Sequence, residues 1–360
     1  MVVVDEERSI AKHSRYATRA TRLGAIGDPV RTPELLLQAA DDLGIRDWVL
    51  FPTLDETVAL ISRHRDALQQ RYTLVTPAWE TVRWAWDKRQ TYRLARDLGI
   101  PYPTTWEPQD VDGLAEVDWA RPVVIKPAIK EHFIYETKAK AWRADSPDEL
   151  HRLFQRAASI VGPEEVLVQE LIPGEGQHLL GYCALVRDGT PVGTMVTRRW
   201  RQHPPEFGRA STYVETIEDP TVESQSELLL SALEYTGLVE LEYKVDPADG
   251  SYKLLDFNAR TWGYHTLGAR AGVDFSALQY RLAVGDDVEP CRARSGVCWV
   301  RLLTDTPTAM VELYRRRLSV RRYLGSLLAA DTEAVFALDD PLPALVECLL
   351  IPYLVRSRGF

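Results

Sequence analysis

Residues 238–263 have the sequence LVELEYKVDPADGSYKLLDFNARTWG, the most informative segment of the chain. Two runs of alternating apolar and polar residues flank Pro247–Ser251, whose residue types favour a hairpin turn. With this loop, Glu242 lies directly opposite Asp256, and Asn258 lies on the same face as Asp256, one step along the strand. The pairs expected nearer the turn are Lys244 with Leu254 and Asp246 with Tyr252.

The two opposed carboxylates need a compensating cation. Side chains directly opposite each other in an antiparallel pair are roughly 5 Å apart at Cβ, and like charges there are destabilising. Two carboxylates and an amide oxygen suit Mg²⁺, which keeps its other positions for water and substrate phosphates. Arg260, the next position on this face, can then pair with a phosphate. The alternative is an exposed hairpin whose acids are solvated or pair with Lys244 and Arg260.

The composition indicates a globular enzyme with two or three subdomains, because 360 residues exceed one compact core. The chain has 43 lysines and arginines against 52 aspartates and glutamates, and the formal charge of −9 disfavours nucleic-acid binding. The four cysteines show no CxxC spacing, so we expect reduced thiols in a cytoplasmic protein.

The C-terminal segment 341–355 is strongly apolar. It is too short to span a bilayer, its prolines break it, and Glu347 interrupts it, so we expect no stable membrane insertion. We expect a helix docked on the body of the protein, with peripheral membrane or partner contact as the alternative. No targeting segment is visible. The sequence leaves a homodimer open.

Residues 1–85 alternate short strands and helices, which is typical of a small parallel-sheet, Rossmann-like domain. The chain opens directly on a strand, so we expect this domain to lack its first strand and helix. Expected strands are residues 2–4, 48–51 and 72–75, and expected helices are 33–43 and 58–69. Asp55 and Glu56 follow the second strand, either to meet an amino group of the substrate or as a solvated turn.

Residues 86–290 have a different, α+β pattern, and residues 291–360 are expected to be a mostly helical extension. Expected helices are 87–98, 146–159, 222–235 and 274–285. A strand at 122–126 ends in Lys126, and two strands joined by the turn Arg187–Thr190 form a hairpin. The stretch 128–144 is expected to be a phosphate-covering loop or a surface hairpin.

Several basic side chains are candidate phosphate ligands, and each of them also has a possible role without a ligand. Lys88 lies in the first turn of a helix, and Lys126 follows a buried strand; surface lysines also occupy both kinds of position. Lys138 and Lys140 lie in the polar stretch 128–144. Arg199 shares one face of a strand with Arg201, where paired guanidiniums suit a carboxylate or acyl phosphate; a solvated edge strand is the alternative.

A strand ends at Gln169–Ile172 and breaks into Pro173–Gly176, which exposes backbone groups that can read an adenine edge. The histidines fit no metal or triad spacing. The sequence has no GxSxG, P-loop or GxGxxG motif, which disfavours a serine hydrolase, a P-loop NTPase and a dinucleotide dehydrogenase.

Five segments, taken in order, resemble the ATP-grasp superfamily, and most closely its carboxylate–amine ligase branch. They are residues 87–103, 123–128, 166–176, 198–215 and 242–263. The resemblance covers roughly residues 86–285. It implies the ATP-grasp fold, a mixture of α/β and α+β structure in which two α+β subdomains hold ATP between them.

The resemblance also implies a role for each matching residue. Lys88 and Lys126 bind the nucleotide, Lys138 reaches a phosphate from a mobile loop, and Glu175 is the candidate ribose ligand. Gln169, Glu170, Leu171 and Ile172 form the hinge around adenine. Glu242, Asp256 and Asn258 hold Mg²⁺, or Mn²⁺ in its place. Arg260 lies near the transferred phosphate, and Arg199 and Arg201 bind substrate or acyl phosphate.

The implied activity is that of an ATP-dependent ligase. The carboxylate of a small molecule or amino acid attacks the γ-phosphate, giving an acyl phosphate and ADP, and an amine then displaces phosphate to form an amide. Two alternatives stay open: a phosphotransferase that delivers the γ-phosphate as final product, and a nucleotide-binding module without chemistry. Whether ADP release requires an amine distinguishes the first two.

Overall fold

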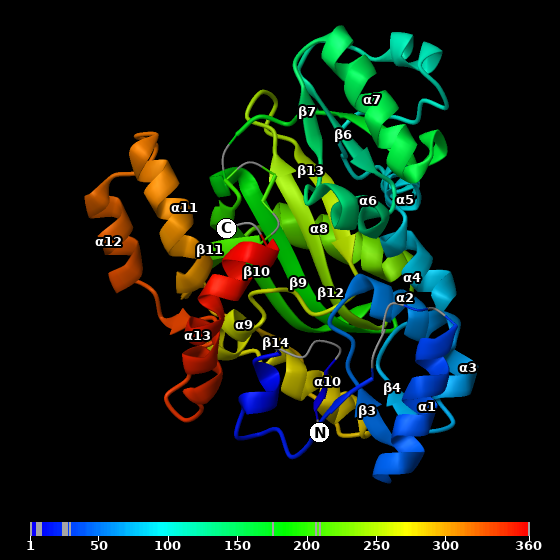
Figure 1. Ribbon diagram of the computed structural model, residues 1–360, viewed down its shortest axis with the longest axis vertical. Coiled ribbons are helices and arrows are strands. Elements are labelled where there is room, and N and C mark those ends of the chain that lie inside the picture. The colour runs from blue at the N-terminus through cyan, green and yellow to red at the C-terminus, as the bar shows by residue number, and fades with distance from the viewer. Residues whose placement is uncertain are drawn as a thin grey trace.

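A curved mixed sheet lies at the centre of the protein (Figure 1), which a computed structural model describes over residues 2–4, 9–23, 28, 30–174, 176–205, 207–208 and 210–358. The strand order is β13-β12-β9-β10-β11-β15-β16, and β14 also pairs with β10. These strands are β9 (Leu179–Arg187), β10 (Thr190–His203), β11 (Ala210–Ile217), β12 (Gly237–Val245), β13 (Tyr252–Asn258), β14 (Cys291–Arg292), β15 (Cys298–Val300) and β16 (Thr332–Glu333).

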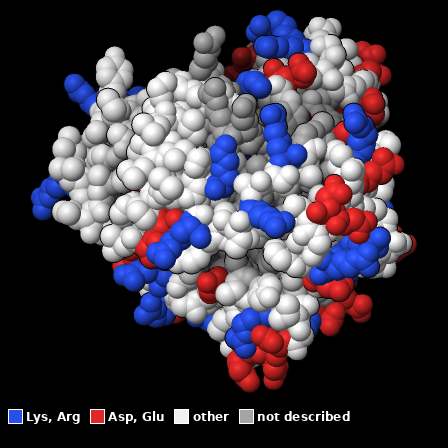
Figure 2. Space-filling view, turned by 60° about the horizontal axis from the view of Figure 1, so that its bottom comes forward, with Lys and Arg blue, Asp and Glu red and all other residues white. Residues whose placement is uncertain are grey.

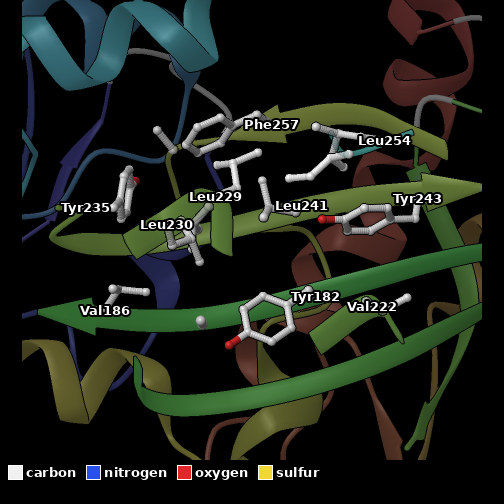
Figure 3. Packing of buried hydrophobic residues seen from close by; sticks show 14 of the residues in the cluster. Tyr182, Val186, Val222, Leu229, Leu230, Tyr235, Leu241, Tyr243, Leu254 and Phe257 are labelled. Atoms are coloured by element: carbon white, nitrogen blue, oxygen red, sulfur yellow. The ribbon is translucent and has the colours of Figure 1, made fainter. Parts of the chain in front are cut away.

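Both faces of this sheet are covered. Along β9, Tyr182 and Val186 point to one face and Cys183 points to the other, as the two-residue period of a strand requires. On the first face they pack against Leu229 of the helix α8 (Pro220–Ala232), which Figure 3 shows from close by. The helices α9 (Thr266–Ala271) and α10 (Phe275–Ala283) contribute to the core on the second face.

The register of the β12–β13 hairpin confirms the central prediction. Glu242 lies opposite Asp256, and Glu240 lies opposite Asn258. Nearer the turn the register shifts by one residue, so that Val245 rather than Asp246 faces Tyr252, and Lys244 faces Lys253 rather than Leu254. The expected pairs there are wrong because a bulge places one extra residue on β13, which a regular alternation does not anticipate.

A second, four-stranded antiparallel sheet has the order β5-β8-β6-β7. Its strands are β5 (Thr105–Trp106), β6 (Val123–Pro127), β7 (Trp142–Ala144) and β8 (Val166–Glu170), and α7 (Pro147–Val161) packs on it. Between β6 and β7 the stretch expected to be a loop or hairpin is instead the helix α6 (Lys130–Thr137). Its apolar residues 133–135 are consecutive, so they show no helical period, yet Phe133 anchors it in the core.

Two helices connect the N-terminal part to the sheets. They are α4 (Trp79–Trp86) and α5 (Lys88–Asp97), and both pack on β13. The helix α5 begins where the sequence predicts, because the Asp87 side chain accepts a hydrogen bond of 2.9 Å from the Arg89 N–H and caps the helix.

The N-terminal strands pair in parallel, as predicted, but not in one sheet. Among the described residues β1 (Val2–Val4) pairs with β2 (Ala20–Arg22), and β3 (Trp48–Leu50) pairs separately with β4 (Tyr72–Leu74). The sequence of β2, ATR, has no apolar alternation and was not predicted. The helices here are α1 (Arg31–Leu43), α2 (Asp55–Arg63) and α3 (Arg65–Leu68).

Residues 291–358 add strands as well as helices. The helices are α11 (Leu302–Tyr314), α12 (Val320–Leu328) and α13 (Leu342–Arg358), but β14, β15 and β16 extend the central sheet, which the expectation of a mostly helical segment missed. Strands of two or three residues are too short to show a period. The docking predicted for the last helix is confirmed: Glu347, 8% exposed, pairs with Arg301.

The described structure also contains four short 3₁₀ helices, at Ala11–His13, Asp112–Glu116, Pro163–Glu165 and Gly176–His178. Within the described ranges, no helix is long and apolar enough to cross a membrane. All four cysteines are free thiols.

The neighbouring residues Leu228 and Leu229 give a matched test of the core. Leu229 is fully buried against β9 and Leu228 is 48% exposed on the same helix. Replacing Leu229 by Ala is expected to lower the free energy of unfolding by about 2–5 kcal/mol, because it leaves a cavity. Leu228→Ala is expected to change it by less than about 1 kcal/mol. Urea denaturation followed by circular dichroism measures both; equal losses would contradict the packing.

Candidate active site

The opposed acids lie at a junction of several elements (Figure 1). The end of β13 meets the start of α5, the end of β6, the start of α6 and the start of α2 around one small pocket. Its walls are mostly polar, and the lining residues are Asp55, Ala85, Trp86, Lys88, Ala128, Lys130, Glu131, Asp256, Phe257 and Asn258.

Cations from three different elements surround the acidic pair. Lys88 forms an ion pair with Asp256, and Arg199 Nη2 lies 3.3 Å from Glu242 Oε2. Burial opposes ionisation of Asp256, but Lys88 and Lys130 outweigh it and hold the pKa of this carboxyl well below its usual range. In the same way Arg199 and Lys140 overcome the burial of Glu242 and lower its pKa.

The alternative of a solvated hairpin does not describe this arrangement. The side chains of Glu242 and Asp256 are only 14% and 20% exposed. Neither Lys244 nor Arg260 pairs with them: Lys244 Nζ donates to the Ile172 carbonyl oxygen over 2.8 Å, and Arg260 turns to Asp55. Two buried, like-charged groups are thus held together by dedicated cations.

Asn258 completes an oxygen-rich group. It is 3% exposed, and its Nδ2 lies 3.4 Å from Glu242 Oε1 and 3.3 Å from Glu240 Oε2. Glu240 is a buried acid that the sequence reasoning did not single out, although its strand position, two before Glu242, places it on the same face. Burial and the charge of Glu242 raise the pKa of Glu240, and Tyr264 donates a 2.6 Å hydrogen bond to it.

Two carboxylates and an amide oxygen are donors that suit a hard cation such as Mg²⁺. In this structure Asn258 Oδ1 accepts a 3.2 Å hydrogen bond from Arg260 Nη2 and its Nδ2 faces the acids, so the amide has to turn over to present its oxygen to a cation. In the described part of the chain, no group of three or more His, Cys, Asp or Glu side chains is arranged to hold a metal ion. A site here therefore needs Asn258 as its third ligand beside Glu242 and Asp256.

The two lysines expected to bind nucleotide lie on the walls of the same region. Lys88 is 9% exposed at the start of α5. Lys126 Nζ donates to the Tyr92 hydroxyl over 2.7 Å and to Gln169 Oε1 over 2.6 Å. Burial lowers the pKa of Lys126, so its charge is poorly compensated by the protein and suits an anionic ligand.

The segment after β8 has the features of a hinge. The Ile172 carbonyl accepts from Lys244, while its N–H has no backbone acceptor among the described residues. The Leu171 N–H already donates to the Pro122 carbonyl over 2.9 Å, and the Glu170 carboxylate accepts from Lys253 Nζ over 2.6 Å. Glu175 lies outside the described residues.

A cluster that joins the N-terminal part to the hairpin is the main feature that sequence reasoning did not find. Arg260 Nε donates to Asp55 Oδ2 over 2.8 Å, and Lys130 pairs with the same carboxylate. Burial raises the pKa of Asp55, but the two cations outweigh it and bring it to about 2. Of the two expectations for Asp55, the solvated turn is wrong: its side chain is 19% exposed.

A signal for Asp55 was present in the sequence. It lies in the connection after β3, five residues beyond the end of that strand, and the carboxyl ends of parallel strands carry binding residues in α/β domains. Lys130 had no comparable signal, because the helix that carries it was not predicted.

Lys138 and Lys140 both follow the end of α6 but have different surroundings. Lys138 is exposed and adopts a left-handed conformation (φ 57°) that terminates the helix. Lys140 is half-buried and its charge acts on Glu242. Of the two, the structure brings Lys140 to the acidic pair.

Arg199 and Arg201 do not share a site, contrary to expectation. The register of β10 shifts between them, so Arg199 faces Val214 and Arg201 faces Tyr213, with Trp200 unpaired. Arg199 contacts Glu242, whereas Arg201 forms two hydrogen bonds of 2.8 Å to Asp305 of α11. The alternation argument failed because the bulge interrupts it.

The comparisons confirm the resemblance to the ATP-grasp superfamily, because the fold matches that of ATP-grasp structures over most of the chain. No family model matches the chain. The D-aspartate ligase of Enterococcus faecium (strain Aus0004) is 25% identical over 245 residues, which are 65% of this chain. The chain spans 58% of the length of that curated relative.

Solved structures match over most of the chain. The L-amino acid ligase of Bacillus licheniformis superposes with a TM-score of 0.60 at 16% identity, covering 78% of this chain and 67% of the ligase. The biotin carboxylase domain of the 2-oxoglutarate carboxylase of Hydrogenobacter thermophilus, solved with MgADP, gives 0.63 at 16% identity, with coverages of 82% and 67%. At these identities, the structures show the fold alone.

The Asp55 cluster predicts a pH dependence of stability. Because the folded pKa of about 2 lies below the ordinary value near 3.9, Asp55 adds about 2 kcal/mol above pH 4, which is lost as the pH falls toward 2. Asp55→Asn is therefore expected to be less stable at pH 7, with the difference shrinking toward pH 3. Urea denaturation across this range measures it, with the exposed Asp97→Asn as control. A difference independent of pH would contradict the assignment.

Proposed function

We propose that this protein is an ATP-dependent ligase that joins a small-molecule or amino-acid carboxylate to an amine through an acyl phosphate. The observation that carries the proposal is the buried, opposed pair of Glu242 and Asp256, held by Lys88 and Arg199 between the two sheets. Such a site is built for a highly charged substrate rather than for a protein nucleophile. The names of the D-aspartate ligase and the L-amino acid ligase support amide-forming chemistry and an amino acid as one substrate.

ATP would lie between the four-stranded sheet and the β12–β13 hairpin. Lys126 and Lys88 would neutralise phosphate oxygens, and the Ile172 N–H would bind the adenine edge in the hinge formed by residues 169–172. Glu175 remains the proposed ribose ligand, and Lys140 takes the phosphate role in place of Lys138.

Glu242, Asp256 and Asn258 would hold Mg²⁺, with Mn²⁺ able to substitute, and the cation would supply positive charge against the phosphate oxygens. The surrounding protein cations serve the same purpose on the other sides. Arg199 is fixed by Glu242 and Arg260 by Asp55, so neither must be ordered when charge develops.

The reaction then needs position and charge rather than covalent help. One carboxylate oxygen of the substrate attacks the γ-phosphorus, the bond to the β,γ-bridging oxygen breaks, and ADP leaves. The amine nitrogen next attacks the acyl carbon, and its proton and inorganic phosphate are released as the amide forms. Arg260 and Arg199 are proposed to stabilise the phosphoryl group and the acyl phosphate.

The reaction class is tested by ³¹P NMR of the protein with MgATP and pooled amino acids, with and without added amines. ADP and phosphate that appear only when carboxylate and amine are both present are the expected result. ADP without an amine, together with a new phosphoryl resonance, would indicate a phosphotransferase. AMP with pyrophosphate would contradict the acyl-phosphate route, and ATP that neither reacts nor binds would contradict the nucleotide site.

Asp256→Asn tests the acidic pair. The change keeps the shape but removes the charge that faces Lys88, and ADP formation is expected to fall at least about 100-fold with the fold intact. Asp249→Asn in the turn of the same hairpin is the matched control, because Asp249 is solvent-exposed and bonds only within the turn. Turnover of Asp256→Asn at the wild-type rate would contradict the site.

Substitutions of the two arginines of β10 are expected to affect different measurements. Arg199→Met is expected to lower the turnover of the folded protein at least about tenfold, because Arg199 faces the reacting groups. It is also expected to lower the free energy of unfolding, because the buried Glu242 loses its partner. Arg201→Met is expected to lower the free energy of unfolding by about 3–5 kcal/mol, because it leaves the buried Asp305 uncompensated, with KM for ATP unchanged. Steady-state kinetics and urea denaturation measure both. A loss of turnover confined to Arg201→Met would reverse the assignment.

A further inference from the structure

The helices α11 and α12 form a hairpin at one side of the molecule (Figure 1). Several large apolar side chains of this hairpin are exposed to solvent. Tyr314 is 90% exposed and Leu328 is 89% exposed. Met310, Val320 and Leu324 are also more than half exposed. Such side chains normally occur singly on a surface, so a group of five on one hairpin indicates a binding surface.

These apolar residues have helical spacing. Val320, Leu324 and Leu328 are each four residues apart on α12, and Met310 and Tyr314 have the same spacing on α11. Residues four apart lie on one side of a helix. An exposed apolar stripe therefore runs along α12 and continues on the last turn of α11, with the exposed arginines beside it.

The same segment is strongly basic. Residues 310–328 contain five arginines and one glutamate, although the whole chain has a formal charge of −9. Arg315, Arg316, Arg321 and Arg322 are exposed and form no ion pair with any described residue. These four arginines have no ion-pair partner in the described part of the chain, so they present a concentrated positive charge to their surroundings.

Figure 2 agrees with this distribution. On the left of the molecule, where Figure 1 places α11 and α12, a broad area of uncharged side chains has Lys and Arg at its edge, while acidic side chains gather mainly on the right. Basic side chains occur on both sides of this view, whereas the acidic ones are concentrated away from the outer left edge.

We propose that residues 310–328 dock the protein on an anionic membrane surface. Apolar side chains enter the boundary between headgroups and acyl chains, and the arginines contact lipid phosphates, which is the combination that holds peripheral helices at a membrane. The acidic remainder of the protein is repelled by the same surface, so the hairpin approaches first. The inference does not depend on the proposed ligase activity.

Two other occupants fit the observations less well. In a symmetric dimer the same patch meets itself, which would place five arginines against five. A nucleic acid offers phosphates to the arginines, but its backbone gives no apolar partner to Leu324 or Leu328. An anionic lipid surface satisfies both the charge and the aliphatic side chains.

The test is flotation of the full chain with vesicles of phosphatidylcholine alone or with added phosphatidylglycerol, at low and high salt. Binding that requires phosphatidylglycerol and weakens with salt is expected. Arg316→Glu with Arg321→Glu should reduce partition by at least roughly fivefold per arginine. Leu328→Ser should reduce it about tenfold.

Matched variants control for charge and for apolar area. Arg46→Glu with Arg96→Glu makes the same charge change at exposed positions elsewhere, and Leu338→Ser changes a leucine that is also 89% exposed. Both should float like the wild type, and circular dichroism checks that all variants fold. No flotation with phosphatidylglycerol, or equal loss in the controls, overturns the proposal. A dimer, seen by light scattering, that Leu328→Ser dissociates would also overturn it. So would binding to heparin that is as strong as binding to the vesicles and is unchanged by Leu328→Ser.

Discussion

The repulsion between Glu242 and Asp256 is the constraint on which the rest of the site depends. Two carboxylates that face each other across an antiparallel pair, both mostly buried, are unstable unless cations reach them. The cations come from separate parts of the chain: Lys88 from the first turn of α5, Arg199 from β10 and Lys140 from the end of α6. The ion pairs that neutralise the acids of this one hairpin thus connect the two sheets and the helices between them.

A second ion cluster brings the N-terminal part into the same structure. Asp55 accepts from Arg260, 205 residues away in the sequence, and from Lys130 of the four-stranded sheet's subdomain. Three parts of the chain therefore meet at one carboxylate. If the N-terminal part moves relative to the hairpin, either the contact between Asp55 and Arg260 breaks or Arg260 moves with Asp55. The position of the start of α2 is therefore coupled to that of the proposed phosphate-binding arginine.

Sequence reasoning predicted the elements that have a regular pattern of side chains. It missed the elements and contacts that depend on residues far apart in the sequence. The hairpin and its acidic pair follow from alternation and turn residues, and the helix at Lys88 was also expected. The helix α6, the short strands β2 and β14 to β16, and the partner of Arg201 were not, because consecutive apolar residues, strands of two or three residues and bulges carry no period. The choice of substrate is equally hidden, since it is made by loops on a widely shared fold.

The bulge in the β12–β13 hairpin affects which of its residues tolerate insertions and deletions. It lies between the turn and the acidic pair, so the register on the turn side differs by one residue from the register at Glu242 and Asp256. The spacing of the carboxylates is consequently not set by the length of the turn. Insertions and deletions at the exposed residues 247–250 can be absorbed on the outer side of the bulge, which leaves the tip of this hairpin open to variation in length while the site beneath it stays fixed.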